Sequence, residues 1–129
     1  MKTKPLLSTL WIFLTVNYLF CDVFSLYYSE TLNQLIAGKK GAIEFTQEFL
    51  LVFAIIMEMP LLMILFSRVL NYKPNRLSNI MASIFMIIIQ VGSLIEGNNT
   101  LHYLFFSLVE IITLSIILWF SMKWKLKQL

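Results

Sequence analysis

Four long runs of apolar residues, separated by short polar links, dominate the pattern of the chain. The runs cover residues 6–28, 45–66, 77–95 and 101–121. Each run is close to the roughly 20 residues that an α-helix needs to cross about 30 Å of hydrocarbon. The strands of a membrane barrel would instead alternate between apolar and polar positions. The pattern therefore predicts four transmembrane helices.

The links between the four predicted helices are short. They read SETLNQLIAGKKGAIE (29–44), SRVLNYKPNR (67–76) and EGNNT (96–100). Links of this length place consecutive helices side by side in opposite directions. We therefore expect an all-α membrane protein in which residues 1–129 form a single domain. Its helices would make an up-down-up-down antiparallel bundle with both termini on one side of the membrane.

The composition and the charges support a membrane location. The 129 residues have a mean hydropathy of +0.80, with 59% hydrophobic and 13% charged residues. A soluble domain this small has too much surface for its volume to hide so much apolar material. Because cytoplasmic loops carry an excess of lysine and arginine, both termini are predicted in the cytoplasm. Only Lys39 and Lys40 fall on the other side, against Lys2, Lys4, Arg68, Lys73, Arg76, Lys123, Lys125 and Lys127.

Motifs for cofactors and for enzymes are missing from the sequence. The one cysteine, Cys21, permits neither an intrachain disulfide nor a cysteine metal cage. There is no Gly-rich phosphate loop, no HExxH and no CxxC. We therefore expect no cofactor and no metal, and a function other than catalysis is favoured. The net charge of +3 lies at the ends of the apolar runs, so the expected partner is the lipid bilayer and not a nucleic acid.

Polar side chains within the apolar runs fall into one stripe on each predicted helix. At about 100° per residue, each of four sets of positions spans a stripe about 80–100° wide. Leu, Ile, Phe, Met and Val occupy the remaining faces. We therefore expect the four stripes to turn inward and form a polar interior. The sets are Tyr18, Asp22, Ser25 and Ser29; Glu44, Gln47, Glu48 and Glu58; Asn79, Ser83, Met86, Gln90 and Ser93; and Tyr103, Ser107, Glu110, Ile117 and Ser121.

Three carboxyl groups, those of Asp22, Glu58 and Glu110, lie inside these runs. A rise of about 1.5 Å per residue places Glu110 near the midplane of the membrane and Glu58 about 3 Å to its cytoplasmic side. An ionised carboxylate at such a depth costs about 2.5 kcal/mol or more. Arg68 and Arg76 lie at the cytoplasmic boundary, too far away to neutralise all three acids. The acids are therefore protonated, or a cation lies among them.

Other polar positions surround these acids or fix the helices. Asp22 and Gln90 are predicted about 6–8 Å outward of the midplane, and His102 at the outer boundary. Pro60 cannot donate to the carbonyl of Ile56, which leaves a free acceptor beside Glu58. The candidates for a proton-linked binding site are Asp22, Glu58, Glu110, Asn17, Gln90, Tyr18 and His102, and the candidates for a structural role are Pro60, Arg68, Arg76 and Asn79.

These residues leave three functions open. The first is binding or transport of a small solute or cation, linked to protons through Asp22, Glu58 and Glu110. Four helices make a thin wall for a pathway, so a homodimer is one arrangement for this function. The second is an intramembrane enzyme acting on a lipophilic substrate, with Glu58 and Glu110 as acid and base. The third is a structural or accessory subunit in which the acids only join helices.

Three stretches of the sequence resemble one known family. They are LSTLWIFLTVNYLFCDVFSL (7–26), EMPLLMILFSRVLNYKPNRLSNI (58–80) and HYLFFSLVEIITLSIILWF (102–120). Over nearly its whole length the chain resembles a family of small four-helix bacterial integral membrane proteins of unknown function. The resemblance implies a multi-pass protein of the bacterial inner (plasma) membrane, and it implies no particular activity. It rests on Asn17, Tyr18, Asp22, Glu58, Pro60, Arg68, Asn75, Arg76, Asn79 and Glu110.

Overall fold

The computed structural model describes residues 2–40, 43–95 and 99–125, and nearly all of them are helical. Four helices are long and apolar enough to cross a membrane, so the prediction of an all-α protein with four transmembrane helices is confirmed. Lys127, counted above among the cytoplasmic cations, lies outside the described residues. The elements are α1 (Thr3–Tyr27), α2 (Ser29–Ala37), β1 (Lys39–Lys40), β2 (Ile43–Glu44), α3 (Gln47–Val69), α4 (Tyr72–Ile95) and α5 (Leu101–Lys123).

The observed elements differ from the predicted ones mainly at their ends. α4 begins at Tyr72 rather than at residue 77. Pro74 does not prevent this, because the first turn of a helix does not need the proline N–H. The predicted link 29–44 also contains structure of its own, namely α2 and the antiparallel pair β1–β2. Gly38 ends α2 with a φ of 78°, a left-handed conformation that suits glycine.

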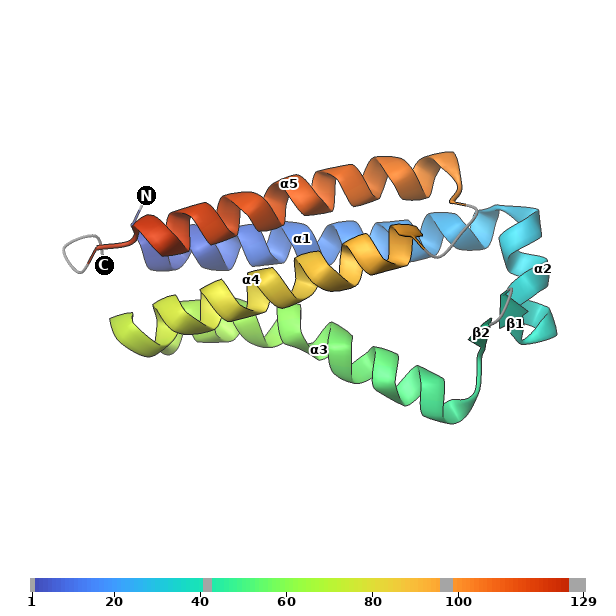
Figure 1. Ribbon diagram of the computed structural model, residues 1–129, viewed down its shortest axis with the longest axis horizontal. Helices are drawn as coiled ribbons and strands as arrows, with labels where there is room; N and C mark the ends of the chain where they lie inside the picture. Colours follow the sequence, from blue (N-terminus) through green and yellow to red (C-terminus); the bar gives the residue numbers. More distant parts are fainter. Residues whose placement is uncertain (1, 41–42, 96–98, 126–129) are drawn as a thin grey trace.

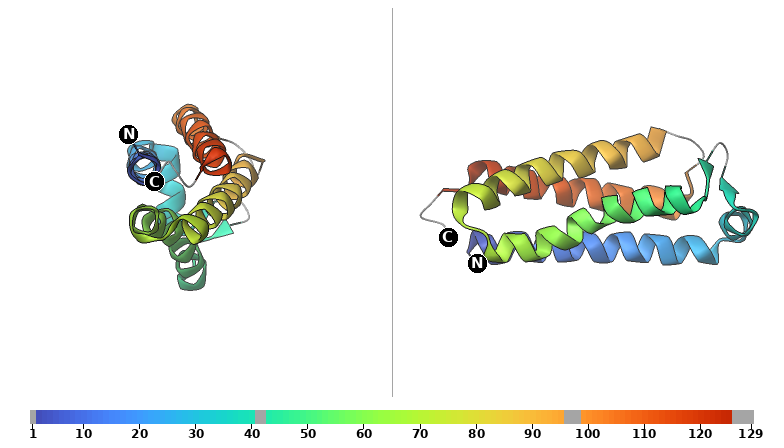
Figure 2. Two further views of the ribbon diagram at one scale, coloured as in Figure 1. Left: turned by 90° about the vertical axis from the view of Figure 1, so that its left-hand side faces the viewer. Right: turned by 90° about the horizontal axis from the view of Figure 1, so that it is seen from below.

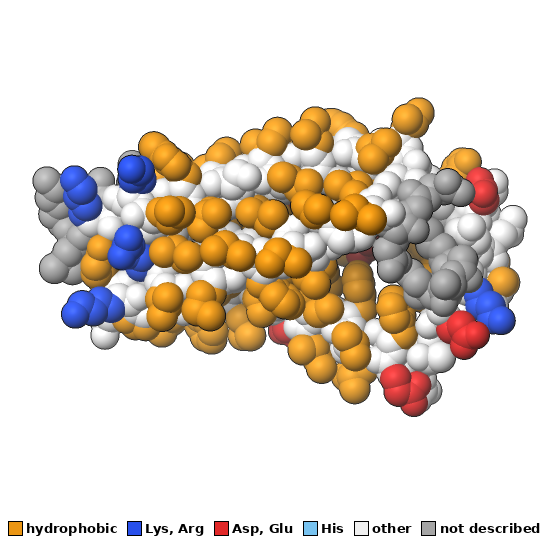
Figure 3. Space-filling view, in the orientation of Figure 1, with side chains coloured by type: hydrophobic (Ala, Val, Ile, Leu, Met, Phe, Trp, Pro, Cys, Tyr) orange, Lys and Arg blue, Asp and Glu red, His pale blue; other side chains and the backbone are white. Residues whose placement is uncertain are grey.

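α5 lies alongside both α1 and α4, α1 and α4 lie diagonally across the bundle, and both termini lie at the same end of the molecule (Figures 1 and 2). We call this the basic end, because lysine and arginine side chains gather there (Figure 3). α2 and the β hairpin lie at the opposite end, which we call the hairpin end. Which end faces the cytoplasm stays a prediction from the charges.

A network of buried amide and hydroxyl groups joins α1, α3 and α4 near the basic end. Asn79 Oδ1 accepts hydrogen bonds from Trp11 Nε1 at 2.7 Å and from Ser67 Oγ at 3.3 Å. Asn79 Nδ2 donates to Asn75 Oδ1 at 2.7 Å, and Asn75 Nδ2 donates to the backbone carbonyl of Ser67 at 2.8 Å. All four residues are 0% exposed. Interhelical polar contacts of this kind fix helices that have no hydrophobic reason to associate in lipid.

Two arginines fasten the same end. Arg68 Nε donates to Ser8 Oγ at 3.1 Å, which ties α3 to α1. Arg76 Nε donates to the carbonyl of Ser121 at 3.0 Å, and its Nη2 donates to the carbonyl of Met122 at 2.9 Å. The last carbonyls of a helix lack partners within it, and a cation there also complements the helix dipole. Arg76 therefore caps the end of α5 from α4.

α3 packs against the other helices only in its half nearer the basic end. Residues 50–55 are all exposed, so the other half is uncovered on every side. The buried side of the helix is formed by Pro60, Met63 and Ser67. Figures 1 and 2 show α3 leaving the bundle on its way to the hairpin end. Pro60, which interrupts the backbone hydrogen bonds of the helix, lies where the two halves meet.

The divergence of α3 leaves a hollow on the surface. Figure 3 shows it between α3 and α4, in the half of the molecule toward the hairpin end, with an acidic side chain visible deep inside. Residues 50–55 in the diverging half of α3 are apolar all round, with their large side chains 45–62% exposed. A helix that is apolar on every side belongs in hydrocarbon. The hollow therefore opens sideways, towards the lipid.

Candidate functional site

α5 places the carboxyl group of Glu110 in the interior of the bundle. The residue is 1% exposed, and among the described residues it is the one buried acid. It belongs to a repeat at helical spacing whose other buried members include Ser107, Ile117 and Ser121. The inward stripe predicted for α5 is therefore confirmed, with Tyr103 half-buried at one end of it.

The Glu110 carboxyl and the Tyr18 hydroxyl are both buried without a partner. Glu110 Oε1 and Tyr18 OH have no hydrogen bond to any residue that the structure describes. The two groups come from α5 and α1 and lie within electrostatic range of each other. A buried polar atom without a partner costs about 1–3 kcal/mol. Two such atoms within electrostatic range of each other leave hydrogen-bonding capacity in the interior that the described residues do not use.

Two hydrogen bonds join α4 to α5 in the part of the bundle that holds Glu110 and Tyr18. Gln90, 6% exposed, donates from Nε2 to Ser107 Oγ at 2.7 Å. One turn further along, the hydroxyls of Ser93 and Tyr103 are hydrogen-bonded to each other. Ser93 Oγ also lies 2.8 Å from the carbonyl of Gln90, to which it donates. The inward stripe predicted for α4 is thus confirmed, since Asn79, Ser83, Met86 and Gln90 are buried and Ser93 is half-buried.

Asp22 is exposed, so the prediction that it is enclosed in the interior is wrong. It follows Trp11 by about three helical turns and therefore shares its side of α1, the side that contacts α4. Its carboxyl is within electrostatic range of Glu110. Because residues 50–55 of α3 are themselves exposed, this half of α3 does not cover Asp22.

Asn17 and His102 make contacts that do not involve the acids. Asn17 Nδ2 donates to the carbonyl of Phe13 in its own helix at 2.9 Å. His102 Nε2 lies 3.1 Å from Ser25 Oγ and 3.4 Å from Thr100 Oγ1. His102 thus joins the start of α5 to α1. Neither residue is brought to Glu110 by a hydrogen bond among the described residues.

Glu58 faces away from the interior, so the inward stripe predicted for the second apolar run, which forms α3, is wrong. Glu44, Gln47, Glu48 and Glu58 are all exposed. Glu58 precedes the buried Pro60 by two residues, which places the two side chains about 160° apart around the helix. α3 packs through the side that carries its small and apolar residues, because burying a carboxylate against another helix would cost its desolvation energy. The acid and base pair expected from Glu58 and Glu110 is therefore not formed within one chain.

We call Glu110, Tyr18, Gln90, Ser107 and Asp22 the Glu110 site. Ser107 was not among the candidate residues, nor were Ser93 and Tyr103, which join α4 to α5 beside it. The available signal was helical spacing: Ser93 is three residues from Gln90, Ser107 is three from Glu110, and Tyr103 is seven from Glu110. The site offers one buried carboxyl and several neutral donors, and no lysine or arginine contacts it among the described residues. Such a set suits a proton or a cation.

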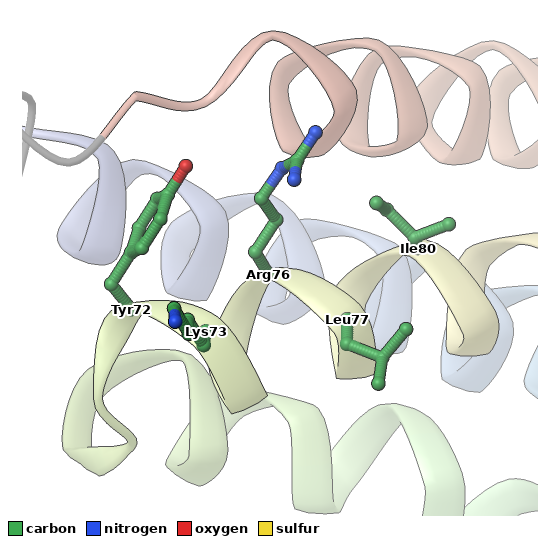
Figure 4. Close-up of a pocket in the computed structure, with 5 residues that line it drawn as sticks. All are labelled: Tyr72, Lys73, Arg76, Leu77 and Ile80. Atoms are coloured by element: carbon green, nitrogen blue, oxygen red, sulfur yellow. The ribbon is translucent and has the colours of Figure 1, made fainter.

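Two further kinds of site, a metal cluster and a surface depression, bear on what the chain can bind. No group of three or more His, Cys, Asp or Glu side chains comes together to hold a metal ion within the described ranges. A shallow depression of about 310 Å³ lies on α4 at the basic end, as Figure 4 shows. Its guanidinium, that of Arg76, is already engaged by the end of α5. The depression is lined by Tyr72, Lys73, Arg76, Leu77 and Ile80.

Four apolar helices with one buried carboxyl define a multi-pass membrane protein. More specifically, the chain belongs to a family of unknown function, DUF6326, whose model matches residues 1–129. The resemblance noted in the sequence to a family of unknown function is thereby confirmed, while a bacterial origin stays a prediction. No match was found among curated proteins or among solved structures.

Proposed function

We propose that this membrane protein binds hydrophobic cations in exchange for a proton at the Glu110 site. The single observation that carries the proposal is the buried Glu110 Oε1, which has no partner among the described residues, within electrostatic range of the Tyr18 hydroxyl, which has none there either. A carboxyl in such a place is neutral while it holds its proton. When a cation enters, the proton leaves and the carboxylate becomes the counter-ion.

The surroundings of the carboxyl favour a cation over an anion or a neutral polar solute. Arg68 and Arg76 lie at the basic end, where Arg68 is hydrogen-bonded to Ser8 and Arg76 to the carbonyl of Ser121. Neither arginine is therefore available as a counter-ion for Glu110 or as a site for an anion. The Tyr18 hydroxyl can donate to the carboxylate, and the face of its ring attracts a cation. The exposed Asp22, whose carboxyl is within electrostatic range of Glu110, adds a second acidic group that attracts a cation.

The apolar walls of the hollow favour a ligand with an apolar body. The uncovered half of α3 presents Val52 and Phe53, which lie on the Pro60 side of the helix and not on the side of Glu58. A strongly hydrated metal ion would lose its water in such an entrance without replacement. A cation whose charge is carried by an apolar body instead leaves the lipid and reaches Glu110 without that penalty.

The test is calorimetry of the full chain in lipid nanodiscs, with tetraphenylphosphonium as the probe and empty nanodiscs as background. We expect saturable binding, release of about one proton per cation, and affinity that rises with pH as the carboxyl loses its proton. Glu110→Gln keeps the shape of the side chain and removes the charge, and it should abolish both effects. Glu48→Gln, an exposed acid in the first turn of α3, is the matched control.

Two results would overturn the proposal. One is the absence of saturable binding by the wild-type chain at any pH at which it is folded. The other is equal affinity and equal proton release in wild type and Glu110→Gln. Loss of binding in Glu48→Gln as well as in Glu110→Gln would show a general charge effect and would also contradict a specific site.

A further inference from the structure

Glu58 lies in the middle of α3 and faces away from the other helices. α3 runs from Gln47 to Val69, so Glu58 is its central residue. At about 1.5 Å per residue it is about 16 Å from either end of the helix. The chain therefore exposes a carboxyl group to lipid at the depth where a charge or an unpaired polar group is least tolerated. Among the described residues, no hydrogen bond or ion pair is made by the Glu58 carboxyl.

The exposed side of α3 around Glu58 has a seven-residue repeat. Leu51, Glu58 and Leu65 are spaced by seven, and so are Ile55, Leu62 and Val69. At about 100° per residue these six positions lie within a stripe about 80° wide. The five apolar members are 44–62% exposed. We call these six residues the outward stripe.

A seven-residue apolar repeat with one polar residue in it is typical of a helix–helix seam. The period of 3.5 keeps the same side of a helix against its partner over several turns. A single polar residue in such a seam fixes the register and the number of helices that associate. In lipid, polar side chains are among the main contributors to the association of helices.

Symmetry favours a second copy of this chain as the partner. The excess of lysine and arginine at the basic end gives every copy the same orientation in the membrane. Two copies related by a two-fold axis along the membrane normal then present Glu58 at the same depth. A protonated carboxyl both donates and accepts a hydrogen bond, so it is complementary to an identical group.

We infer that the outward stripe of α3 is a homodimer interface in which the two Glu58 carboxyls are hydrogen-bonded to each other. This interface is independent of the Glu110 site, because Glu58 and the buried face of α3 lie on opposite sides of the helix. It also accounts for a carboxyl that the fold of one chain leaves unsatisfied. Glu58 is thus assigned to assembly and Glu110 to ligand binding.

The first test is the dimer fraction of the full chain in lipid bilayers, measured by energy transfer as the protein-to-lipid ratio is varied. We expect dimers of the wild type, and also of Glu58→Gln, whose amide pair is likewise self-complementary. Glu58→Leu should raise the dissociation mole fraction by about tenfold. The matched control is Ser115→Leu, which removes an exposed polar group from the outer side of α5.

The second test locates the contact by disulfide cross-linking in a Cys21→Ser background. Leu51→Cys on the outward stripe and Leu108→Cys on α5 are each 61% exposed as leucines, which matches their accessibility. We expect a covalent dimer from the position on α3 and none from the position on α5. A monomeric wild type in bilayers, equal dimerisation of Glu58→Leu, or cross-linking from α5 alone would overturn the inference. In native membranes, a product from α3 with a mass other than twice the monomer would overturn it in favour of a different partner.

Discussion

The two central glutamates of this chain have opposite surroundings although their sequence contexts are alike. Both lie among apolar residues in the middle of a long helix, Glu58 in AIIMEMPLL and Glu110 in SLVEIITL. Glu110 is buried in the interior, whereas Glu58 is exposed on the far side of α3. The spacing of polar residues predicts which of them share a side. It does not predict whether that side packs or faces lipid, because this depends on the neighbouring helices.

The Tyr18 hydroxyl allows ligand binding to be separated from folding. Because the hydroxyl has no partner among the described residues, Tyr18→Phe removes a group that folding leaves unsatisfied. We expect unchanged or slightly higher resistance to unfolding, and affinity for tetraphenylphosphonium lowered by about tenfold, since a hydrogen bond to a carboxylate is lost. Thermal unfolding and calorimetry measure the two effects on the same sample.

The control for this substitution is Tyr103→Phe. The Tyr103 hydroxyl is bonded to Ser93, so its removal should lower stability without a direct effect on the carboxylate. Equal loss of stability in both variants would mean that the Tyr18 hydroxyl has a partner after all. Unchanged affinity in Tyr18→Phe would remove Tyr18 from the binding site.

At the scale of the elements, the sequence predicts the helices and two of the four inward stripes. The long apolar runs predict α1, α3, α4 and α5. The inward stripes of α4 and α5 are predicted correctly, because the polar residues of these stripes lie beside small residues on the same side of the helix. The stripe of α3 is not, because Pro60, Met63 and Ser67 form its packed side. α2 is nine residues long and half polar, too short to be distinguished from a link. Whether Glu110 Oε1 and the Tyr18 hydroxyl find hydrogen-bond partners depends on the distances between helices. The spacing of residues along one helix does not contain those distances.

The asparagine network should account for much of the stability of the basic end. Asn79→Ala removes the acceptor of Trp11 Nε1 and the donor to Asn75 Oδ1, both buried. Interhelical hydrogen bonds in membrane proteins contribute about 0.6 kcal/mol each on average, up to about 1.7 kcal/mol. We therefore expect Asn79→Ala to lower the free energy of unfolding by about 1–3 kcal/mol.

Asn17→Ala provides the comparison for that loss. Among the described residues Asn17 bonds only to the carbonyl of Phe13 in its own helix, so the change should be within about 0.5 kcal/mol. Unfolding in mixed detergent micelles gives both values under one condition. Similar values for the two asparagines would contradict a network that holds α1, α3 and α4 together.

At the scale of the whole molecule, the charges and the divergence of α3 set the arrangement. Lysine and arginine gather at the basic end, where the hydrogen bonds between helices are also concentrated (Figure 3). Towards the hairpin end α3 separates from the bundle and leaves a hollow between α3 and α4 (Figure 3). One end of the molecule is therefore fixed and the other is open to lipid. This division is consistent with a binding site entered from the side and with a second copy held along α3.

The most direct measurement for the central claim is infrared difference spectroscopy of the protein in lipid, recorded before and after addition of tetraphenylphosphonium. If Glu110 exchanges a proton for the cation, the carbonyl band of a protonated carboxyl disappears and a carboxylate band appears. Glu110→Gln should show neither change, and Glu58→Gln should show both. A wild-type spectrum in which the cation binds and no carboxyl band changes would contradict the account.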